Sequence, residues 1–440
     1  MSINHDSGDN GPSRREFLKG ATTAGVATAA SAALMATGNY AFAQGSDTIK
    51  VGLIGCGGRG TGAAADAMQA DPGAKLVAMG DVYKRQLDNS LRTLLQQEDI
   101  KAKIDVAPEK QFVGLDAYKH VLDTDVDVVL LTTPPGFRPL HVKAAVAANK
   151  HIFAEKPLGT DVAGVRSALE AVRAGQSKGK CFVSGFCYRY ATTHKQFYKR
   201  LHEGAIGPVR AIHATYVTGP VKPMPPASAR PAGMSDTEWQ IRNWYNFVWL
   251  CGDGLIEQAC HSIDKILWAM KDVPPVRAVG TGGRMFPNNE GNIYDHIDVF
   301  YEWPDGTRAT MAQRQMPNLP HNDNTDYVIG TKGVGTVHFA AAEMTGDTMW
   351  RTDPPPKSMY HLEHDALFAA IRAGKQINDV ERMARSTIAG LMGRMAAYTG
   401  AQITWDQIMK SKEDLFPASL DWNGALPIAE MAIPGKTPVV

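Results

Sequence analysis

Glycines at a fixed spacing give the segment Gly55–Gly60 (G-C-G-G-R-G) the clearest chemical meaning in the chain. It follows the apolar run Ile49–Ile54, which is typical of a buried strand. In such a G-x-G-x-x-G turn, Gly55 permits the tight bend, Gly57 lets the backbone approach a pyrophosphate, and Gly60 lets the next helix pack on the strand. An Ala-rich helix follows and directs its N-terminus toward the phosphates. The pattern predicts a dinucleotide-binding site.

An acidic residue follows at about the distance at which such sites bind the adenosine ribose. The run Lys75–Gly80 predicts a second strand, and Asp81 stands at its end. A carboxylate there accepts hydrogen bonds from the ribose, which favours NAD over NADP. Lys84 and Arg85 lie close behind and keep NADP open as the alternative cofactor.

Two further predicted strands end in residues that suit the same site. Asp127–Leu131 leads into Thr132-Thr133-Pro134 and a helix from His141, and Lys150–Ala154 leads into Glu155-Lys156-Pro157. Ligands of open α/β sheets bind beyond the carboxyl ends of the strands, so we expect Lys156 beside the reactive ring of the cofactor. The residues expected at the cofactor are Gly55, Gly57, Gly58, Arg59, Gly60, Asp81, Thr132, Thr133, Pro134, His141, Glu155 and Lys156.

The remaining patterns predict two domains of α/β class. A helix over Asp161–Gly175 and a strand over Cys181–Phe186 complete a Rossmann domain over residues 48–188. Residues 189–415 then predict an α/β domain with a mixed or antiparallel sheet, and 416–440 a C-terminal tail. The elements predicted for the second domain are strands over Val209–Val217, Asp295–Trp303 and Thr307–Gln313, with a turn at Asp305-Gly306, and helices over His361–Arg372 and Asp379–Thr399.

One segment of the second domain cannot form a regular element. Gly219–Gly233 is rich in Pro, Ala and Met, and we expect a long loop that covers the site or a neighbouring subunit.

Composition limits the kinds of partner. Lys and Arg total 46 and Asp and Glu 45, so the formal net charge is +1 and provides no long-range field for nucleic acid. The five cysteines show no C-x-x-C spacing, so the sequence predicts no metal site and reduced, mostly buried thiols.

The N-terminus predicts export of a folded protein. Ser13–Lys19 (S-R-R-E-F-L-K) reads as a twin-arginine signal, and Ala41-Phe42-Ala43 offers the small residues that a signal peptidase needs. Residues 1–43 would then be a signal peptide, the Tat machinery a partner, and the periplasm the destination. An uncleaved anchor is the alternative, but Gly20–Ala43 is rich in Thr, Ser and Gly.

Three separated segments together resemble the Gfo/Idh/MocA oxidoreductase family. They are Gly55–Gly60, Glu155-Lys156-Pro157, and Gly252–Asp264 (G-D-G-L-I-E-Q-A-C-H-S-I-D), and Asp365–Gly374 resembles the closing helix of the family. The resemblance implies an open-faced second domain, a substrate held between nicotinamide and the second sheet, and a homo-oligomer, either a dimer or a tetramer.

The resemblance also implies that Lys156 is catalytic and that Glu257 and His261 face the substrate. His261 has the pKa for removing a hydroxyl proton, and a cationic Lys156 would stabilise a developing alkoxide. The spacing of four residues would place Glu257 on the same helical face, where it binds a second hydroxyl or orients His261. The family usually has aspartate at this position. A simple Lys-Pro turn and a structural histidine are the alternatives. Candidate substrate contacts are Tyr188, Arg189, Trp244, Asp264 and His321.

The sequence therefore favours an exported NAD(P)-dependent dehydrogenase acting on a secondary hydroxyl, keto or hemiacetal carbon of a sugar, glycoside or cyclitol. Free NAD is scarce in the periplasm, so we expect a tightly bound cofactor, recycled by a second sugar as in the glucose–fructose oxidoreductase branch. One alternative is an NAD-dependent glycosidase or lyase, whose usual motif replaces the Lys-Pro pair present here. Another is a non-catalytic cofactor-binding protein, which the intact Lys156 and His261 disfavour.

Overall fold

The computed structural model describes residues 47–286 and 289–440. The predicted twin-arginine segment and the cleavage site after Ala43 lie outside these residues. No helix within the described ranges is both long and apolar enough to span a bilayer. The five cysteines all fall within these ranges, and each is buried with a free thiol.

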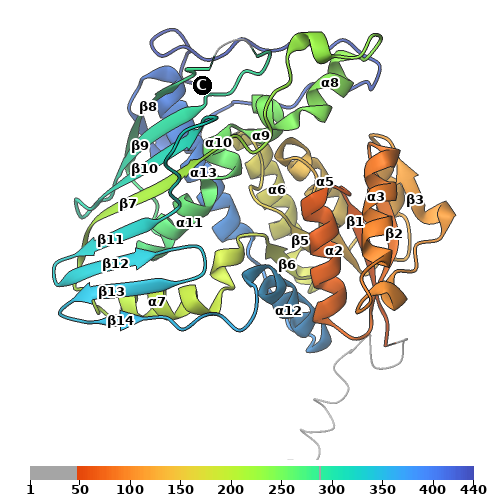
Figure 1. Cartoon of the computed structure of the whole chain (residues 1–440), viewed down its shortest axis with the longest axis horizontal. Coiled ribbons are helices and arrows are strands. Elements are labelled where there is room, and N and C mark those ends of the chain that lie inside the picture. Colours follow the sequence, from red (N-terminus) through yellow and green to blue (C-terminus); the bar gives the residue numbers. More distant parts are fainter. Residues whose placement is uncertain (1–46, 287–288) are drawn as a thin grey trace, which may run out of the picture. The chain divides into compact units, whose positions relative to one another are not determined.

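The first domain is a parallel six-stranded sheet with helices on both faces, which confirms the predicted Rossmann fold (Figure 1). Alternate residues of its strands face opposite ways: Val128 and Leu130 join one apolar core, and Val129 and Leu131 the other. Burial on both faces explains the uninterrupted apolar runs of these strands. The strands in sheet order are β3 (Gln111–Val113), β2 (Ala74–Asp81), β1 (Ile49–Ile54), β4 (Val128–Leu131), β5 (His151–Ala154) and β6 (Phe182–Ser184), and the helices are α2 (Gly58–Ala70), α3 (Lys84–Leu95), α4 (Ala117–Leu122), α5 (Arg138–Ala147) and α6 (Val162–Gly175).

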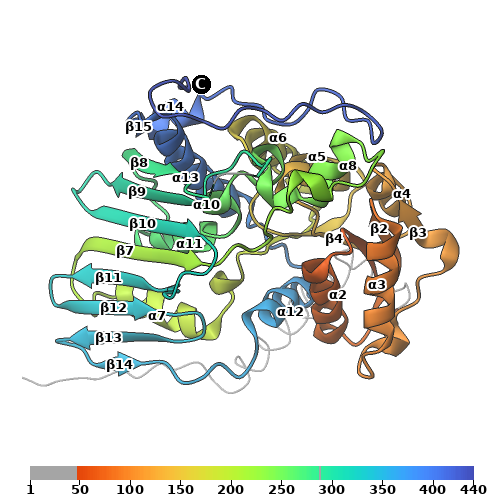
Figure 2. The same ribbon diagram turned by 45° about the horizontal axis from the view of Figure 1, so that its top comes forward.

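The second domain is a mixed sheet whose strands lie side by side in Figure 2. All its strand pairs are antiparallel except β7 with β10. One face packs on helices, whereas Val279, Phe300 and Ile329 are exposed. The strands in sheet order are β14 (Trp350–Arg351), β13 (Ala342–Gly346), β12 (Gly333–Val337), β11 (Asp326–Gly330), β7 (Val209–Thr218), β10 (Arg308–Gln315), β9 (His296–Glu302), β8 (Arg277–Gly283) and β15 (Ile403–Thr404).

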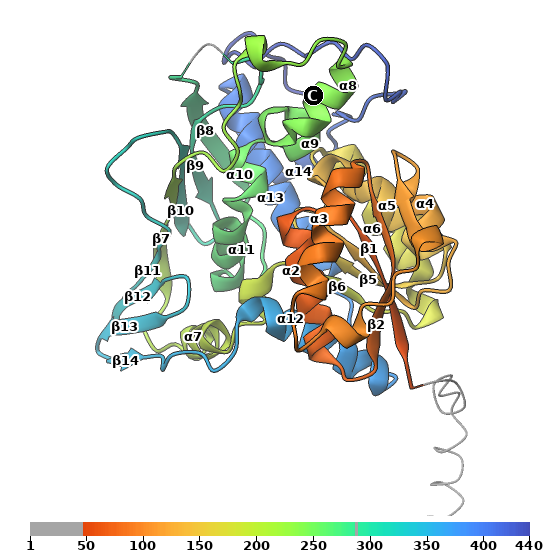
Figure 3. The same cartoon turned by 45° about the vertical axis from the view of Figure 1, so that its right-hand side comes forward.

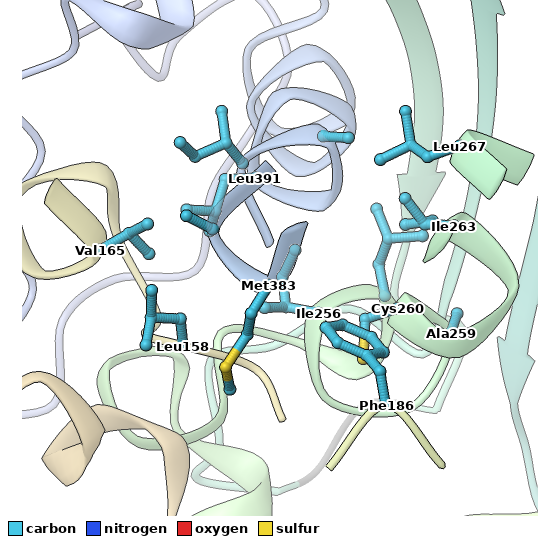
Figure 4. Close-up of a cluster of buried hydrophobic side chains, with 14 of the residues drawn as sticks. Leu158, Val165, Phe186, Ile256, Ala259, Cys260, Ile263, Leu267, Met383 and Leu391 are labelled. Atoms are coloured by element: carbon cyan, nitrogen blue, oxygen red, sulfur yellow. The ribbon is translucent and has the colours of Figure 1, made fainter. Parts of the chain in front are cut away.

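Helices of the second domain pack on both sheets. The long helix α13 (Val380–Thr399) contacts β8, α6 and α11 (Cys260–Ala269), so Met383 and Leu391 share one apolar core with Val165 and Ile263 (Figure 4). Further along the chain from β14, α12 (Met359–Arg372) packs against α2 of the first domain (Figure 3). The remaining helices are α7 (Thr192–His202), α8 (Asp236–Arg242), α9 (Val248–Cys251), α10 (Gly254–Glu257) and α14 (Trp405–Met409).

Candidate active site

A cavity of about 940 Å³ lies at the carboxyl ends of the first sheet and is closed by residues of the second domain. Lys156, Glu257 and His261 all line it. Every residue expected at the cofactor lines it as well, namely Gly55, Gly57, Gly58, Arg59, Gly60, Asp81, Thr132, Thr133, Pro134, His141, Glu155 and Lys156.

The glycine loop has the geometry that a dinucleotide needs. Gly55 has a φ of 99°, and a Cβ on Gly60 would lie 1.9 Å from the carbonyl oxygen of Gly55. A Cβ on Gly57, by contrast, would meet nothing within 4 Å. Gly55 and Gly60 are therefore required by the turn and its packing, while the open space at Gly57 leaves room for phosphate at the N-terminus of α2.

Asp81 ends β2 and lines the cavity near Arg85. Its carboxylate accepts hydrogen bonds from the backbone N–H groups of Cys56, at 2.6 Å, and Tyr83, at 2.8 Å. Burial raises the pKa of this carboxyl. These bonds fix the carboxylate beside the glycine loop, and Lys84 is occupied by an ion pair with Asp88.

Arg59 links the glycine loop to α12, a contact that sequence reasoning missed. Its guanidinium donates to Glu155 and, at 2.8 Å, to Glu363, and it lies 4.8 Å from the ring centroid of Tyr360. Burial alone would lower the pKa of Arg59, but these carboxylates raise it above its ordinary value. Glu155 is thus held by Arg59, and Tyr360 joins the cavity wall.

Lys156 and Glu257 form a buried ion pair between the two domains. The Lys156 ammonium donates to Glu257 Oε1 at 2.9 Å and also to the Glu257 main-chain carbonyl. Burial acts to lower the pKa of Lys156, but the negative charge of Glu257 outweighs it and raises the pKa. Lys156 is therefore a fixed cation at the cavity wall.

His261 is held as a neutral imidazole beside this pair. Burial, reinforced by the charges of Lys156 and Lys265, lowers its pKa well below the ordinary value. The rings of Phe186 and Tyr188 pack edge-on against it, with centroids 5.8 and 5.3 Å away. A neutral imidazole at this wall is able to accept a proton.

Two buried polar atoms at this wall have no hydrogen-bond partner in the described part of the protein. Glu257 Oε2 and His261 Nδ1 make no hydrogen bond within residues 47–286 and 289–440. Buried polar atoms in native proteins nearly always have a partner, and both residues line the cavity. Both atoms are closed to solvent.

The single helix that we expected to carry Glu257 and His261 is broken in the structure. The prediction that the two residues share one helical face is therefore wrong. α10 ends at Glu257 and α11 begins at Cys260, with Gln258 and Ala259 between them. Glu257 pairs with Lys156, and no bond joins it to His261 in the described part of the chain. The break leaves Gln258 facing the cavity, where its Oε1 accepts from the Tyr216 hydroxyl at 2.7 Å.

Of the five candidate substrate contacts, one belongs to the cavity wall and the other four do not. Trp244 lines the cavity. Tyr188 packs behind His261, and His321 is exposed. Arg189 and Asp264 lie outside the cavity wall and bind each other at 2.7 Å, with side chains 3% and 1% exposed. Arg189 and Asp264 are therefore a buried ion pair of the protein interior, although both lie close to site residues in the sequence.

His141 lines the cavity as a buried, uncharged residue. Its Nδ1 lies 3.0 Å from the Thr133 hydroxyl oxygen, and its ring packs on Tyr118. Burial and the nearby Arg138 lower its pKa to about 3.

The depressed pKa of His141 predicts a loss of stability in mild acid. The unfolded histidine binds a proton near its ordinary value of 6.5, but the folded one does not until about 3, so stability is full above 6.5 and falls as the pH drops through this range. Between neutral pH and pH 5, we expect the wild-type free energy of unfolding to fall about 2 kcal/mol more than that of His141→Gln. Urea denaturation at both pH values measures this difference, and parallel pH dependences would contradict it.

A glycine loop, an acidic strand end and a strand-end lysine share one cavity with a carboxylate and an imidazole of a second domain, which defines a two-domain dinucleotide-binding protein. Residues 49–186 match the Gfo/Idh/MocA family, described as "Oxidoreductase family, NAD-binding Rossmann fold". The match covers the first domain of this chain.

Curated proteins are similar to part of this chain. An inositol 2-dehydrogenase of Acidiphilium cryptum is 33% identical over 170 residues, which cover 38% of this chain and 46% of that protein. A trans-1,2-dihydrobenzene-1,2-diol dehydrogenase of Mus musculus is 25% identical over 53% of this chain and 62% of its own length. The chain spans about half the length of the first curated relatives that it matches.

Solved structures extend the likeness of fold to the second domain. Aldose-aldose oxidoreductase from Caulobacter crescentus has a TM-score of 0.64 at 18% identity, over 81% of this chain and 99% of that one. A levoglucosan dehydrogenase in complex with NADH and levoglucosan gives the same values. The two-domain architecture predicted from the sequence is therefore confirmed.

Proposed function

We propose that this protein is an NAD(P)-dependent oxidoreductase that transfers a hydride between a nicotinamide and a secondary hydroxyl or keto carbon of a sugar or cyclitol. The observation that carries the proposal is the ion-paired Lys156 beside the neutral His261, in the cavity that the glycine loop lines. The family match of the first domain and the names of its relatives, inositol 2-dehydrogenases among them, support it.

The residues present fit the cofactor. The open space at Gly57 would take the pyrophosphate, and Asp81 would meet the adenosine ribose, which favours NAD. When bound, the nicotinamide supplies the two-electron acceptor for the hydride. The overall reaction is secondary alcohol plus NAD(P)⁺ to ketone plus NAD(P)H and a proton.

The chain's own groups provide the proton transfer and the charge stabilisation. His261, neutral and part of the cavity wall, takes the hydroxyl proton as the hydride leaves carbon. Lys156 stabilises the developing alkoxide, and Glu257 holds its ammonium in place. The amide of Gln258, a residue of the cavity wall, is then available to a neighbouring hydroxyl, which fits a polyhydroxylated substrate.

The proposal also includes export and assembly. The sequence Ser13–Lys19 supports Tat export to the periplasm, and the exposed Val279, Phe300 and Ile329 on the second sheet support a homo-oligomer formed through that face.

A spectral titration tests the proposed reaction. The purified protein, alone and with added NAD or NADP, is mixed with a panel of hexoses, glycosides and inositols while the reduced-nicotinamide band is recorded. Growth of that band with one compound supports the dehydrogenase and names its substrate. A protein that binds neither nucleotide would contradict the proposal and favour a role without turnover.

A further inference from the structure

A segment of the second domain lies over the dinucleotide cavity; we call residues 219–244 the roof. Its first part contains no strand or α-helix and only a short 3₁₀ helix at Ala227–Ala229, as its composition predicts, and it continues into α8. The roof residues that line the cavity are Lys222, Pro225, Ala229, Pro231, Glu238, Trp239, Ile241, Arg242, Asn243 and Trp244.

The roof is bonded to the first domain at the adenosine end. Tyr83 lies two residues after Asp81, and its hydroxyl donates to the main-chain carbonyl of Glu238 at 3.1 Å. Burial raises the pKa of this phenol, so it stays a donor at neutral pH. The loop that follows the ribose-binding strand end is thereby joined to the roof.

Residues 410–440 follow α14 without a further helix or strand; they contain the predicted tail 416–440, and from here on we call the whole segment the C-terminal tail. It runs along the outside of the roof (Figures 1 and 2). The amide of Gln240 donates to the carbonyl of Leu426 at 2.6 Å, and the N–H of Leu426 donates to Asp236 at 3.1 Å. The hydroxyl of Ser235 donates to the carbonyl of Trp422. Bonds in both directions fix the tail in one register on α8.

The same tail is also attached to the first domain. The ring of Trp422 packs edge-on against that of Tyr83, with centroids 5.4 Å apart, and Phe416 packs on Phe137 at 5.7 Å. The N–H of Leu415 donates to Asp161 at 3.0 Å. Roof, tail and first domain are thus joined pairwise, and their apolar side chains form one cluster.

Two cations of the roof face the cavity that the glycine loop lines. Lys222 and Arg242 belong to its wall, and the Lys222 ammonium donates to the Arg242 carbonyl at 2.5 Å. Burial, with the charge of Arg242, lowers the pKa of Lys222 from its ordinary value. A partly desolvated ammonium with a guanidinium nearby suits the diphosphate of a dinucleotide.

We infer that the roof, held down by the C-terminal tail, is the outer half of the dinucleotide site and retains the cofactor between turnovers. The inference rests on the proposed function. For the cofactor to leave, the Tyr83–Glu238 bond and the contacts of Trp422 must open together, which slows release.

The test measures how fast NADH leaves. Protein loaded with NADH is mixed with excess NAD, and the loss of bound-NADH fluorescence is followed for the wild type and for a Tyr83→Phe, Trp422→Ala double variant. We expect release to be at least about tenfold faster in the variant, because two attachments of the roof are cut. Ile433→Ala, an exposed residue further along the same tail, is the matched control and should change the rate less than about twofold.

A second measurement needs no variant. Hydrogen exchange of residues 415–428 should slow when NADH is bound to the wild-type protein, because a closed roof protects the tail. Release within twofold of wild type from a folded double variant, or equal exchange with and without NADH, would overturn the inference. A wild-type protein that binds no NADH would instead overturn the proposed function.

Discussion

Replacement of Lys156 by alanine is expected to lower kcat by about 10²- to 10⁴-fold. Lys156 is a buried cation at the cavity wall, so its loss removes the charge that stabilises the alkoxide. It also leaves the carboxylate of Glu257 buried without its partner, at a wall where negative charge develops. Steady-state rates with the substrate found in the spectral titration measure the effect.

Lys150→Ala is the matched control for this prediction. Lys150 stands at the other end of β5, where its ammonium donates to the carbonyl of Thr124 at 3.1 Å. Its loss should change kcat by less than about threefold. NADH binding by Lys156→Ala, measured by fluorescence, separates a lost reaction from a lost cofactor. A Lys156→Ala enzyme with kcat within tenfold of wild type would contradict the assigned role.

Replacement of Arg189 by alanine is expected to lower the free energy of unfolding by about 3–5 kcal/mol, because it leaves Asp264 buried without its cation. Arg189 donates to both carboxylate oxygens of Asp264, at 2.7 and 3.0 Å, and Ser386 donates to the same carboxylate at 2.7 Å. Urea denaturation measures the loss. The folded fraction should keep its KM, since Arg189 does not line the cavity.

Asp272→Asn provides the contrast within the same network. Asp272 binds Arg189 at 2.6 Å but its side chain is 34% exposed, so its loss should cost less than about 1 kcal/mol. A large rise in KM for Arg189→Ala with unchanged stability would contradict the structural role and restore the substrate contact that the sequence suggested.

The first sheet and its glycine loop were predictable because their signals are local. Apolar runs mark β1, β2, β4 and β5, and the cofactor residues follow those strands directly in the sequence. β3 has three residues and only partial burial, too little for a recognisable pattern. In the second domain, β11 to β14 are short and contain glycine and polar residues, so periodicity does not mark them.

The site was predictable in its motifs but not in its partners. Arg59 meets Glu363 across 304 positions, and Lys156 meets Glu257 across 101, distances over which no spacing rule acts. Neither proline nor glycine stands at positions 258 and 259, so the sequence gives no signal for the helix break between Glu257 and Cys260. Only tertiary packing shows that Glu257 serves Lys156 instead of His261.

The most direct test of the proposed reaction follows the hydride itself. The substrate identified by titration is prepared with deuterium on the carbon that is oxidised, the wild-type protein is incubated with it and NAD, and the nicotinamide is examined by mass spectrometry. We predict one deuterium on the reduced nicotinamide, and loss of that transfer in Lys156→Ala. Oxidised substrate without deuterium in the nicotinamide would contradict hydride transfer at this site.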